Sequence, residues 1–322
     1  MEKLDAVLCA AASPLMPNDA ARDAAATRAD ASVPALASLL PVDSLVAAYN
    51  LLLAVVWASL TTRVSYAPWL CAVHLVAASL PIALRQCPRP RWRVTACLRE
   101  YYPLLWLVGF WTELGYLLPL LHPRFFDAAV ERLDVTLFGA SWSTKWMERA
   151  PSLWVSEPMH LLYMLFFPVV AVPPLAFGLT GRRDALRDVT FRLALAYLGC
   201  CLVYLLVPVA GPVRDAPAGA ALTRGICYRL IGLYWRIGNS LGTAFPSFHV
   251  AAAVTVVFVA WRWMGRALAW AMTALAVGLA LSTVYTRHHY TIDAAAGALL
   301  AVVLQALVAP LLQRRPALGR HP

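Results

Sequence analysis

The sequence Phe245-Pro246-Ser247-Phe248-His249 is followed, 40 residues after its histidine, by Arg287-His288-His289-Tyr290-Thr291-Ile292-Asp293. Two apolar segments lie between these motifs, residues 246–264 and 267–285, joined by a short Gly265-Arg266 turn. As helices, segments of about 19 residues would each extend about 28 Å, close to the hydrocarbon thickness of a bilayer. The chain is therefore expected to cross a membrane and return, which places both histidine motifs at one membrane face.

The composition extends this interpretation to the whole chain. Of its 322 residues, 61% are hydrophobic and only 14% are charged, which is unusual for a soluble protein of this length. We identify about eight candidate spans, at residues 42–62, 66–84, 103–121, 158–177, 189–209, 246–264, 267–285 and 292–312. The predicted fold class is an all-α, polytopic integral membrane protein in which two additional N-terminal spans precede a six-helix core.

The basic residues predict the orientation and exclude one class of partner. With eight spans both termini lie on one side, and the loops of that side carry more Lys and Arg than the opposite loops. The positive-inside rule therefore predicts cytoplasmic termini and an active site on the extracytoplasmic face. Arg far outnumbers Lys, which favours a bacterial plasma membrane, the inner membrane, as the location. The net charge of +10 is spread over short loops, so the expected partners are membrane lipids and not nucleic acid.

The chain divides by composition into four parts. Residues 1–40 form an Ala-rich tail that is expected to be cytoplasmic and disordered and that lacks the pattern of a cleavable signal. Residues 41–100 hold the two additional spans and a linker, residues 101–313 the catalytic membrane core, and residues 314–322 a cytoplasmic tail. The seven cysteines show neither disulfide nor metal-ligand spacing, and the sequence does not indicate an oligomeric state.

His249, His289 and Asp293 are the residues expected to carry out chemistry. A neutral imidazole is a nucleophile and a protonated one is an acid near pH 7, so two histidines can divide a phosphoester transfer between them. Asp293 follows His289 by one helical turn and can orient it, as the aspartate of a serine hydrolase triad orients its histidine. In this scheme His289 attacks phosphorus and His249 protonates the departing oxygen, with no cofactor and no metal. A single interfacial histidine would more often be a polar anchor, but three such groups at matching depth favour catalysis.

Five further polar side chains are candidates for substrate binding: Ser247, Arg214, Arg287, Glu113 and Tyr290. The Ser247 hydroxyl could seat an anion together with the free backbone donors of a helix whose first turn contains Pro246. Glu113 lies well inside an apolar run, where a carboxylate is costly, and it could line a head-group pocket or pair with Arg192. Tyr163 and Tyr290 could form pocket walls, although interfacial tyrosines are common enough to explain both.

One long segment, residues 122–157, separates two of the predicted spans. Charged and apolar side chains alternate there at helical spacing, and three tryptophans follow. This pattern predicts a helix lying in the membrane interface on the side of the histidines. A role as a lid or lipid entry and plain interfacial packing both fit it.

The two histidine motifs resemble those of the type-2 phosphatidic acid phosphatase superfamily, which pairs Pro-Ser-x-His with His-x-x-x-Asp. The likeness is closer to the branch that contains inositol phosphorylceramide synthase, and residues 289–293 are also similar to an element of sphingomyelin synthases. Weaker similarities to this branch are Leu133-Asp134-x-x-Leu137-Phe138-Gly139, Pro208-Val209-Ala210-Gly211-Pro212 and the bulky Phe248 where simple phosphatases carry Gly. The resemblance covers about residues 100–320. It implies a six-helix phosphatidic-acid-phosphatase-like core and a phosphohistidine on His289, with Asp293 as its partner and His249 as the acid.

The chain departs from the family pattern in its phosphate clamp. The family's first motif, a Lys and then Arg-Pro, is absent near the end of the fifth span, where Gly211-Pro212-Val213-Arg214-Asp215 stands. The Arg that usually lies six positions before the second histidine is Thr283 here. Arg214 and Arg287 are the available substitutes, although contact with lipid head groups or a salt bridge to Asp215 would also explain them.

We therefore predict a membrane lipid phosphotransferase that moves a phosphate-linked head group between lipids through a phosphohistidine intermediate. The main alternative is a lipid phosphate phosphatase of the same superfamily, in which water replaces the acceptor. A metal-dependent enzyme that uses the two histidines and Asp293 as a facial triad, and a lipid transporter with Glu113 and Arg192 along its path, explain less of the sequence.

Overall fold

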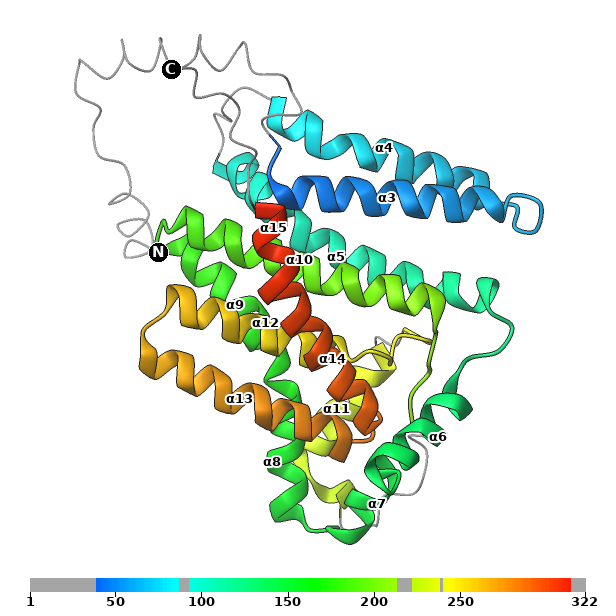
Figure 1. Cartoon of the computed structure of the whole chain (residues 1–322), viewed down its shortest axis with the longest axis vertical. Coiled ribbons are helices and arrows are strands. Elements are labelled where there is room, and N and C mark those ends of the chain that lie inside the picture. Colours follow the sequence, from blue (N-terminus) through cyan, green and yellow to red (C-terminus); the bar gives the residue numbers. More distant parts are fainter. Residues whose placement is uncertain (1–38, 87–92, 213–221, 238–239, 314–322) are drawn as a thin grey trace. The chain divides into compact units, whose positions relative to one another are not determined.

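The computed structural model describes residues 39–86, 93–212, 222–237 and 240–313, and the chain is almost entirely helical in these parts (Figure 1). The predicted tail 314–322 and nearly all of the predicted tail 1–40 lie outside the described residues. The helices are α3 Pro41–Ser59, α4 Ala67–Gln86, α5 Arg93–Leu121, α6 Asp127–Phe138, α7 Trp142–Arg149, α8 Leu153–Met164, α9 Phe166–Leu179, α10 Arg183–Leu206, α11 Ile226–Ile237, α12 Phe248–Trp263, α13 Arg266–Tyr285, α14 Thr291–Val303 and α15 Ala309–Gln313, with a 3₁₀ turn at Leu222–Arg224 and a π-helical turn, η3, at Leu304–Val308.

The helices match the predicted spans. In the described part of the chain, seven helical stretches are long and apolar enough to cross a membrane, and each corresponds to one predicted span. The remaining predicted span is α12, which has only 16 residues. The prediction of an all-α polytopic membrane protein is therefore confirmed.

Two details of the spans differ from the prediction. The segment 158–177 was expected to be one helix, but it belongs to two, because α8 ends at Met164 and α9 begins at Phe166. Pro168 explains the break, since it has no N–H to donate to the carbonyl of Met164. The predicted first helical turn at Pro246 is also wrong, because α12 begins at Phe248, after Pro246.

The described chain forms two compact units. One contains the α3–α4 hairpin, inside which His74 Nδ1 lies 2.9 Å from Asn50 Oδ1, both residues being buried. The other unit contains residues 100–177 and the chain from residue 184 onward, and it includes both histidine motifs.

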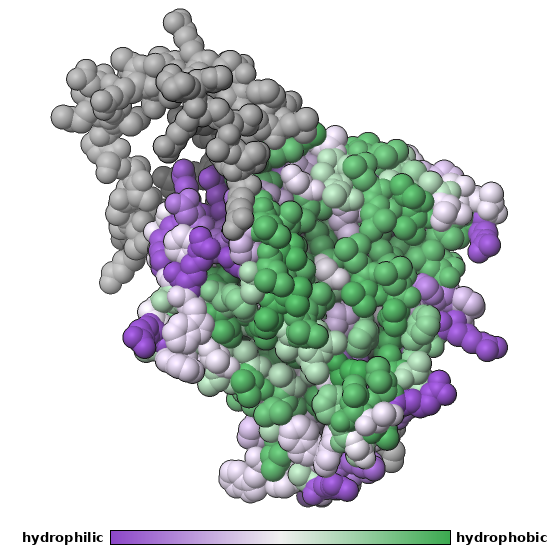
Figure 2. Space-filling view, in the orientation of Figure 1, coloured by the Kyte–Doolittle hydropathy of each residue, from purple (hydrophilic) through white to green (hydrophobic). Residues whose placement is uncertain are grey.

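Helix α10 forms the core of this second unit. In its spanning window 72% of the residues are buried, compared with 22–33% in the other spanning windows of the unit. Those other helices expose apolar side chains such as Val108, Leu175 and Leu299. Apolar residues cover much of the visible helical surface in Figure 2, as expected for helices that contact lipid.

A buried polar cluster joins α10 to the ends of α12 and α15. Arg192 Nε lies 3.0 Å from Asp188 Oδ1, and Arg192 Nη1 donates to Gln305 Oε1 at 3.1 Å. Asp188 also accepts hydrogen bonds from Trp263 and Gln313. Arg192 was considered as a partner of Glu113, but its short ion pair is with Asp188. The cluster lies at the end of α12 opposite its histidine.

Candidate active site

The structure brings together the two histidines that the sequence placed on one face. His249 Nδ1 lies 3.3 Å from His289 Nε2. His249 is the second residue of α12, and Ser247 caps that helix by accepting a hydrogen bond from the backbone of Val250. His289 precedes α14, so the N-terminal ends of two helices meet at the histidine pair.

The turn before α14 gives His289 its position. The backbone N–H groups of His288 and His289 donate to the carbonyl of Thr283, at 3.0 Å and 3.1 Å. Arg287 permits this sharp turn by adopting a φ of 60°, a left-handed conformation that is uncommon for a long side chain. Thr283 therefore contributes to this turn through its backbone carbonyl.

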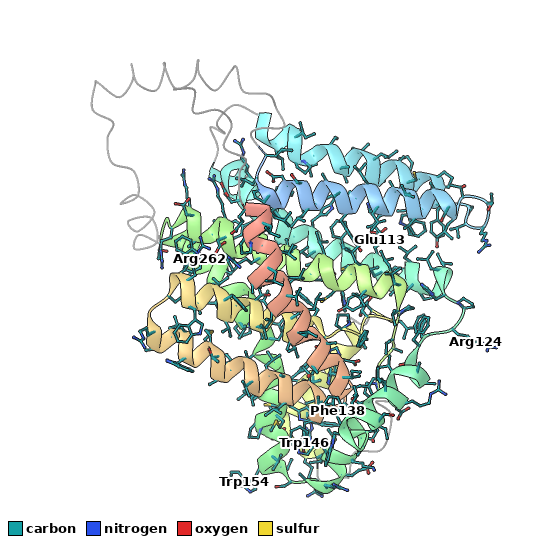
Figure 3. All side chains as sticks on the ribbon, in the orientation of Figure 1. Glu113, Arg124, Phe138, Trp146, Trp154 and Arg262 are labelled. Atoms are coloured by element: carbon teal, nitrogen blue, oxygen red, sulfur yellow. The ribbon has the colours of Figure 1, made fainter. Side chains whose placement is uncertain are left out.

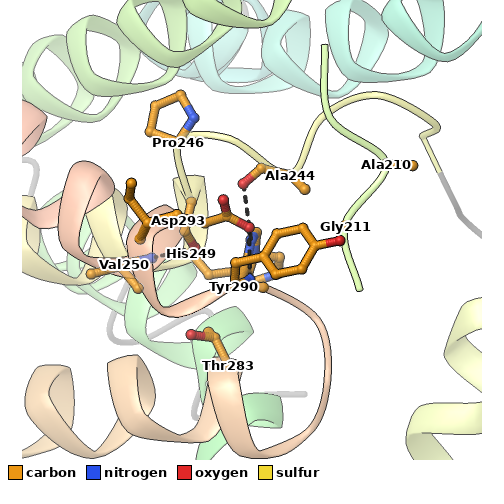
Figure 4. Close-up of polar contacts among 12 residues, drawn as sticks. Ala210, Gly211, Ala244, Pro246, His249, Val250, Thr283, Tyr290 and Asp293 are labelled. Atoms are coloured by element: carbon orange, nitrogen blue, oxygen red, sulfur yellow. Dashed lines mark hydrogen bonds and ion pairs between the residues drawn. The ribbon is translucent and has the colours of Figure 1, made fainter. Parts of the chain in front are cut away.

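The ring of His289 is oriented by two acceptors. Its Nδ1 lies 2.9 Å from the carbonyl oxygen of Ala244 and 3.5 Å from Asp293 Oδ2. Figure 4 shows Ala244 and Asp293 beside the labelled His249 and Tyr290. A carbonyl oxygen can only accept a hydrogen bond, so Nδ1 carries the proton. The Nε2 atom that faces His249 consequently carries no proton and presents a lone pair, as a nucleophile requires.

Asp293 holds the starts of α12 and α14 together. Its Oδ2 accepts from the backbone N–H of Tyr290 at 2.8 Å, and its carbonyl accepts from the N–H of Ser247 at 2.9 Å. The side chain is fully buried. Gly297 makes the close approach possible, because a Cβ at that position would collide with the backbone oxygen of Ser247.

Tyr163, at the end of α8, contacts the other side of His249. Its hydroxyl lies 3.1 Å from His249 Nε2, and its ring lies 3.9 Å from that of His288, centroid to centroid. His288 turns away from the histidine pair and its Nδ1 donates to the carbonyl of Thr286. The sequence indicated Tyr163 only as a pocket wall, and no local pattern links it to a histidine 86 positions away.

Helix α6 supplies two carboxylates that sequence reasoning did not assign to the site. Asp134 is fully buried and accepts from the backbone N–H of Ile292 at 2.7 Å. Asp127 accepts from the backbone N–H groups of Ala210 and Gly211. Burial raises the pKa of the Asp134 carboxyl above its ordinary value, and the hydrogen bond from Ile292 opposes that shift. The only sequence signal for these contacts was a weak motif that included Asp134.

Ser247 and Tyr290, two of the predicted binding residues, make their observed contacts at the starts of α12 and α14. Ser247 is fully buried, and its hydroxyl accepts from Val250 N at 3.4 Å. Tyr290 is the N-cap residue of α14 and packs against Val130 and Val209. Burial raises the pKa of the Tyr290 hydroxyl well above its usual value, and nearby carboxylates, the first being Asp127, raise it further.

The three charged binding candidates, Arg287, Glu113 and Arg214, differ in what the structure shows of them. The Arg287 guanidinium contacts α7, with Nη2 at 3.3 Å from the Thr144 carbonyl and 3.4 Å from Glu148 Oε1. Glu113 lies on α5, and Figure 3 shows it well apart from Trp146 of α7. Arg214 lies outside the described residues.

The arrangement also bears on the metal-triad alternative. Among the residues that the structure describes, no three His, Cys, Asp or Glu side chains converge in a way that could hold a metal ion. His249, His289 and Asp293 instead form a row, in which His289 lies between the other two.

A comparison with protein families gives one match, described as the PAP2 superfamily, over residues 130–307. The match begins in α6 and ends in η3, so it includes His249, His289 and Asp293 and leaves out Glu113. Comparisons with curated proteins and with solved structures give no match.

Proposed function

This chain belongs to the PAP2 superfamily, whose members are phosphatases or phosphotransferases acting on phosphoesters, and we propose that it is a lipid phosphotransferase working through a phosphohistidine. The reaction would move a phosphate-linked head group from one membrane lipid to another. The observation that carries this proposal is the pair of imidazole nitrogens 3.3 Å apart, with Nδ1 of His289 held by Ala244 and Asp293.

In the first step, the Nε2 lone pair of His289 attacks the phosphorus of the donor lipid. The bond from phosphorus to the oxygen of the departing lipid alcohol breaks, and His249 donates the proton on Nδ1 to that oxygen. His289 then carries the head-group phosphate and a positive charge. Asp293, 3.5 Å from Nδ1, stabilises that charge.

In the second step, an acceptor alcohol attacks the same phosphorus. His249, now neutral, takes the proton of the alcohol on Nδ1, and the phosphorus–nitrogen bond breaks with its electron pair returning to His289. Both residues end in their starting protonation states. At 3.3 Å the two rings are in direct contact, so they must separate slightly when a phosphate enters between them.

Helix dipoles support the binding of an anion despite the missing clamp. The N-terminal ends of α12 and α14, which carry partial positive charge, both lie at the histidine pair. Arg287 lies two residues before His289, and its guanidinium contacts Thr144 and Glu148 of α7. The carboxyl groups of Asp293 and Asp134 lie buried beside the start of α14.

Burial of the nucleophile supports transfer over hydrolysis. Only 4% of His289 is exposed, so water has little access to a phosphohistidine there. Phe248, which stands where simple phosphatases carry Gly, packs its ring against Tyr197 and Phe166 inside the bundle. The preference for transfer therefore rests on the exclusion of water and not on Phe248. We place the reaction in the extracytoplasmic leaflet of a bacterial plasma membrane, as the loop charges favour.

The test is a partition experiment with purified protein in lipid nanodiscs. Donor phospholipids labelled in the head-group phosphate are supplied with and without candidate acceptor lipid alcohols. The proposal expects label in a new lipid, less water-soluble product when acceptor is present, and an acid-labile, base-stable label on the protein that His289→Ala lacks. Release of phosphate that no acceptor diverts would identify a phosphatase instead.

A further inference from the structure

A row of four polar groups crosses the active site. The Tyr163 hydroxyl lies 3.1 Å from His249 Nε2, His249 Nδ1 lies 3.3 Å from His289 Nε2, and His289 Nδ1 lies 2.9 Å from the carbonyl oxygen of Ala244. Each imidazole thus uses both nitrogens, and the row has a carbonyl at one end and a hydroxyl at the other.

The carbonyl sets the direction of every hydrogen bond in the row. It can only accept, so His289 carries its proton on Nδ1 and a lone pair on Nε2. His249 must then present a proton on Nδ1, because two lone pairs 3.3 Å apart would repel. In the resting neutral form of His249, before any proton is transferred, Nε2 is therefore a lone pair and Tyr163 donates to it. When His249 is protonated, its Nε2–H donates to the Tyr163 oxygen.

We propose that Tyr163 is the positioning residue that confines proton exchange to Nδ1 of His249. A tyrosine hydroxyl both donates and accepts, so it remains a partner of Nε2 in either protonation state. When His249 gives its Nδ1 proton to the departing oxygen, the remaining proton stays on Nε2 against Tyr163, and Nδ1 is left bare as the base for the acceptor alcohol. This inference rests on the proposed function, because it assigns the nitrogen that trades protons in both steps.

The surroundings of Tyr163 suit such a role. The residue is 1% exposed, and its ring lies 3.9 Å from the ring of His288 and 4.9 Å from that of His249, centroid to centroid. His288 is itself fixed by a 2.8 Å hydrogen bond to the carbonyl of Thr286. Phe166, the first residue of α9, packs on the other part of the His249 ring. The hydroxyl is therefore held by ring packing that a phenylalanine at position 163 would keep.

The test compares two leaving groups in Tyr163→Phe. In single-turnover measurements with a phospholipid donor, release of the lipid alcohol should slow by about 10- to 100-fold, as expected for a lost hydrogen bond to a charged group. With an aryl ester of the same head-group phosphate, whose leaving group needs no acid, release should slow by less than about threefold. KM should change little for either substrate, because Tyr163 acts through His249.

Tyr101→Phe is the matched control. Its hydroxyl donates to the carbonyl of Pro174 at 2.9 Å, outside the histidine pair, so its removal costs one partly buried tyrosine hydrogen bond without touching His249. We expect near wild-type rates on both substrates. Equal losses on the lipid and the aryl ester in Tyr163→Phe would mean a merely structural role, and an unaffected lipid rate would mean no role. Either result overturns the proposal.

A second variant avoids any change of shape. Replacing Tyr163 with 3-fluorotyrosine makes the hydroxyl a stronger donor and a weaker acceptor, which favours neutral His249 over the protonated form. The basic limb of the pH profile of the first step should therefore shift to lower pH. The other titratable or charged groups around the site are unchanged in this variant: His288, His289, Arg287 and Asp293. An unshifted limb would contradict the proposal. If instead His249→Ala stays active or no phosphohistidine forms, the proposed function itself fails.

Discussion

Asp134 on α6 accepts a hydrogen bond from the backbone N–H of Ile292 at 2.7 Å, across 158 positions of sequence. Ile292 is the second residue of α14 and lies between His289 and Asp293. The helix predicted to lie in the membrane interface is therefore hydrogen-bonded directly to the start of α14, close to His289. This contact makes α6 a support for the candidate active site, and it can be tested separately from the proposed chemistry.

The first prediction concerns the pH dependence of stability. Because burial raises the pKa of Asp134, the folded protein holds a proton there more readily than the unfolded chain. The contribution of this carboxyl to stability is complete at acidic pH and falls as pH rises through the folded-state pKa. Asp134→Asn keeps an acceptor oxygen but cannot ionise. Its Tm relative to wild type should therefore increase between about pH 4 and about pH 7.5. A constant offset in thermal unfolding across this range would contradict the assignment.

The second prediction concerns the histidine pair. His249→Ala and His289→Ala should each lower turnover of the true lipid substrate by at least about 10³-fold while expression and membrane insertion persist, because each removes one of two complementary roles. His122→Asn is the control, since the His122 ring bonds only a backbone carbonyl, that of Leu205, in its observed contact. Substantial turnover in either alanine variant would rule out the two-histidine mechanism.

The third prediction separates orientation from binding. Asp293→Asn can still accept the hydrogen bond from Tyr290, so the start of α14 should persist. It loses the charge that stabilises protonated or phosphorylated His289, and kcat should fall by about 10²- to 10⁴-fold with little change in lipid affinity. Steady-state kinetics with an independent lipid-binding assay measure this split. A variant that loses affinity and turnover together would point to a damaged pocket.

The fourth prediction concerns metals. Exhaustive treatment with EDTA should leave turnover intact, because the His289 lone pair needs no metal to act as a nucleophile. Activity is measured before and after chelation and after addition of zinc or iron. Loss on chelation with recovery on metal addition would favour the metal-dependent alternative.

The fifth prediction concerns topology. A glycosylatable site or reporter placed in residues 214–236 should report the extracytoplasmic side, and one placed after Arg314 should report the cytoplasm. The reversed pattern would contradict the charge bias of the loops and move the substrates to the inner leaflet.

The spans and the pairing of the histidines could be predicted because both depend on local patterns. Hydrophobic length gave the helices, and the return of α13 to the face where α12 begins follows from two spans of similar length. Pro168 accounts for the break between α8 and α9, but Pro173 and Pro174 lie inside α9 without ending it, so the sequence does not indicate which proline interrupts a helix.

The supports of the site could not be predicted in this way. Tyr163 and Asp134 reach their partners across 86 and 158 positions, and such contacts depend on how whole helices pack. The cap at the start of α12 also depends on the folded geometry. The Ser247 hydroxyl accepts from the backbone of Val250 there, and its role in phosphate binding stays a prediction.

Gly297 determines how closely α14 can approach the start of α12. A single methyl group at this position could be accommodated only by moving α14 away from the first turn of α12, and that motion would carry His289 away from His249. The separation of the two imidazoles, on which the proposed exchange depends, is thus controlled by a residue with no side chain to contribute. A substitution at Gly297 would change that separation without replacing any of the groups proposed to react.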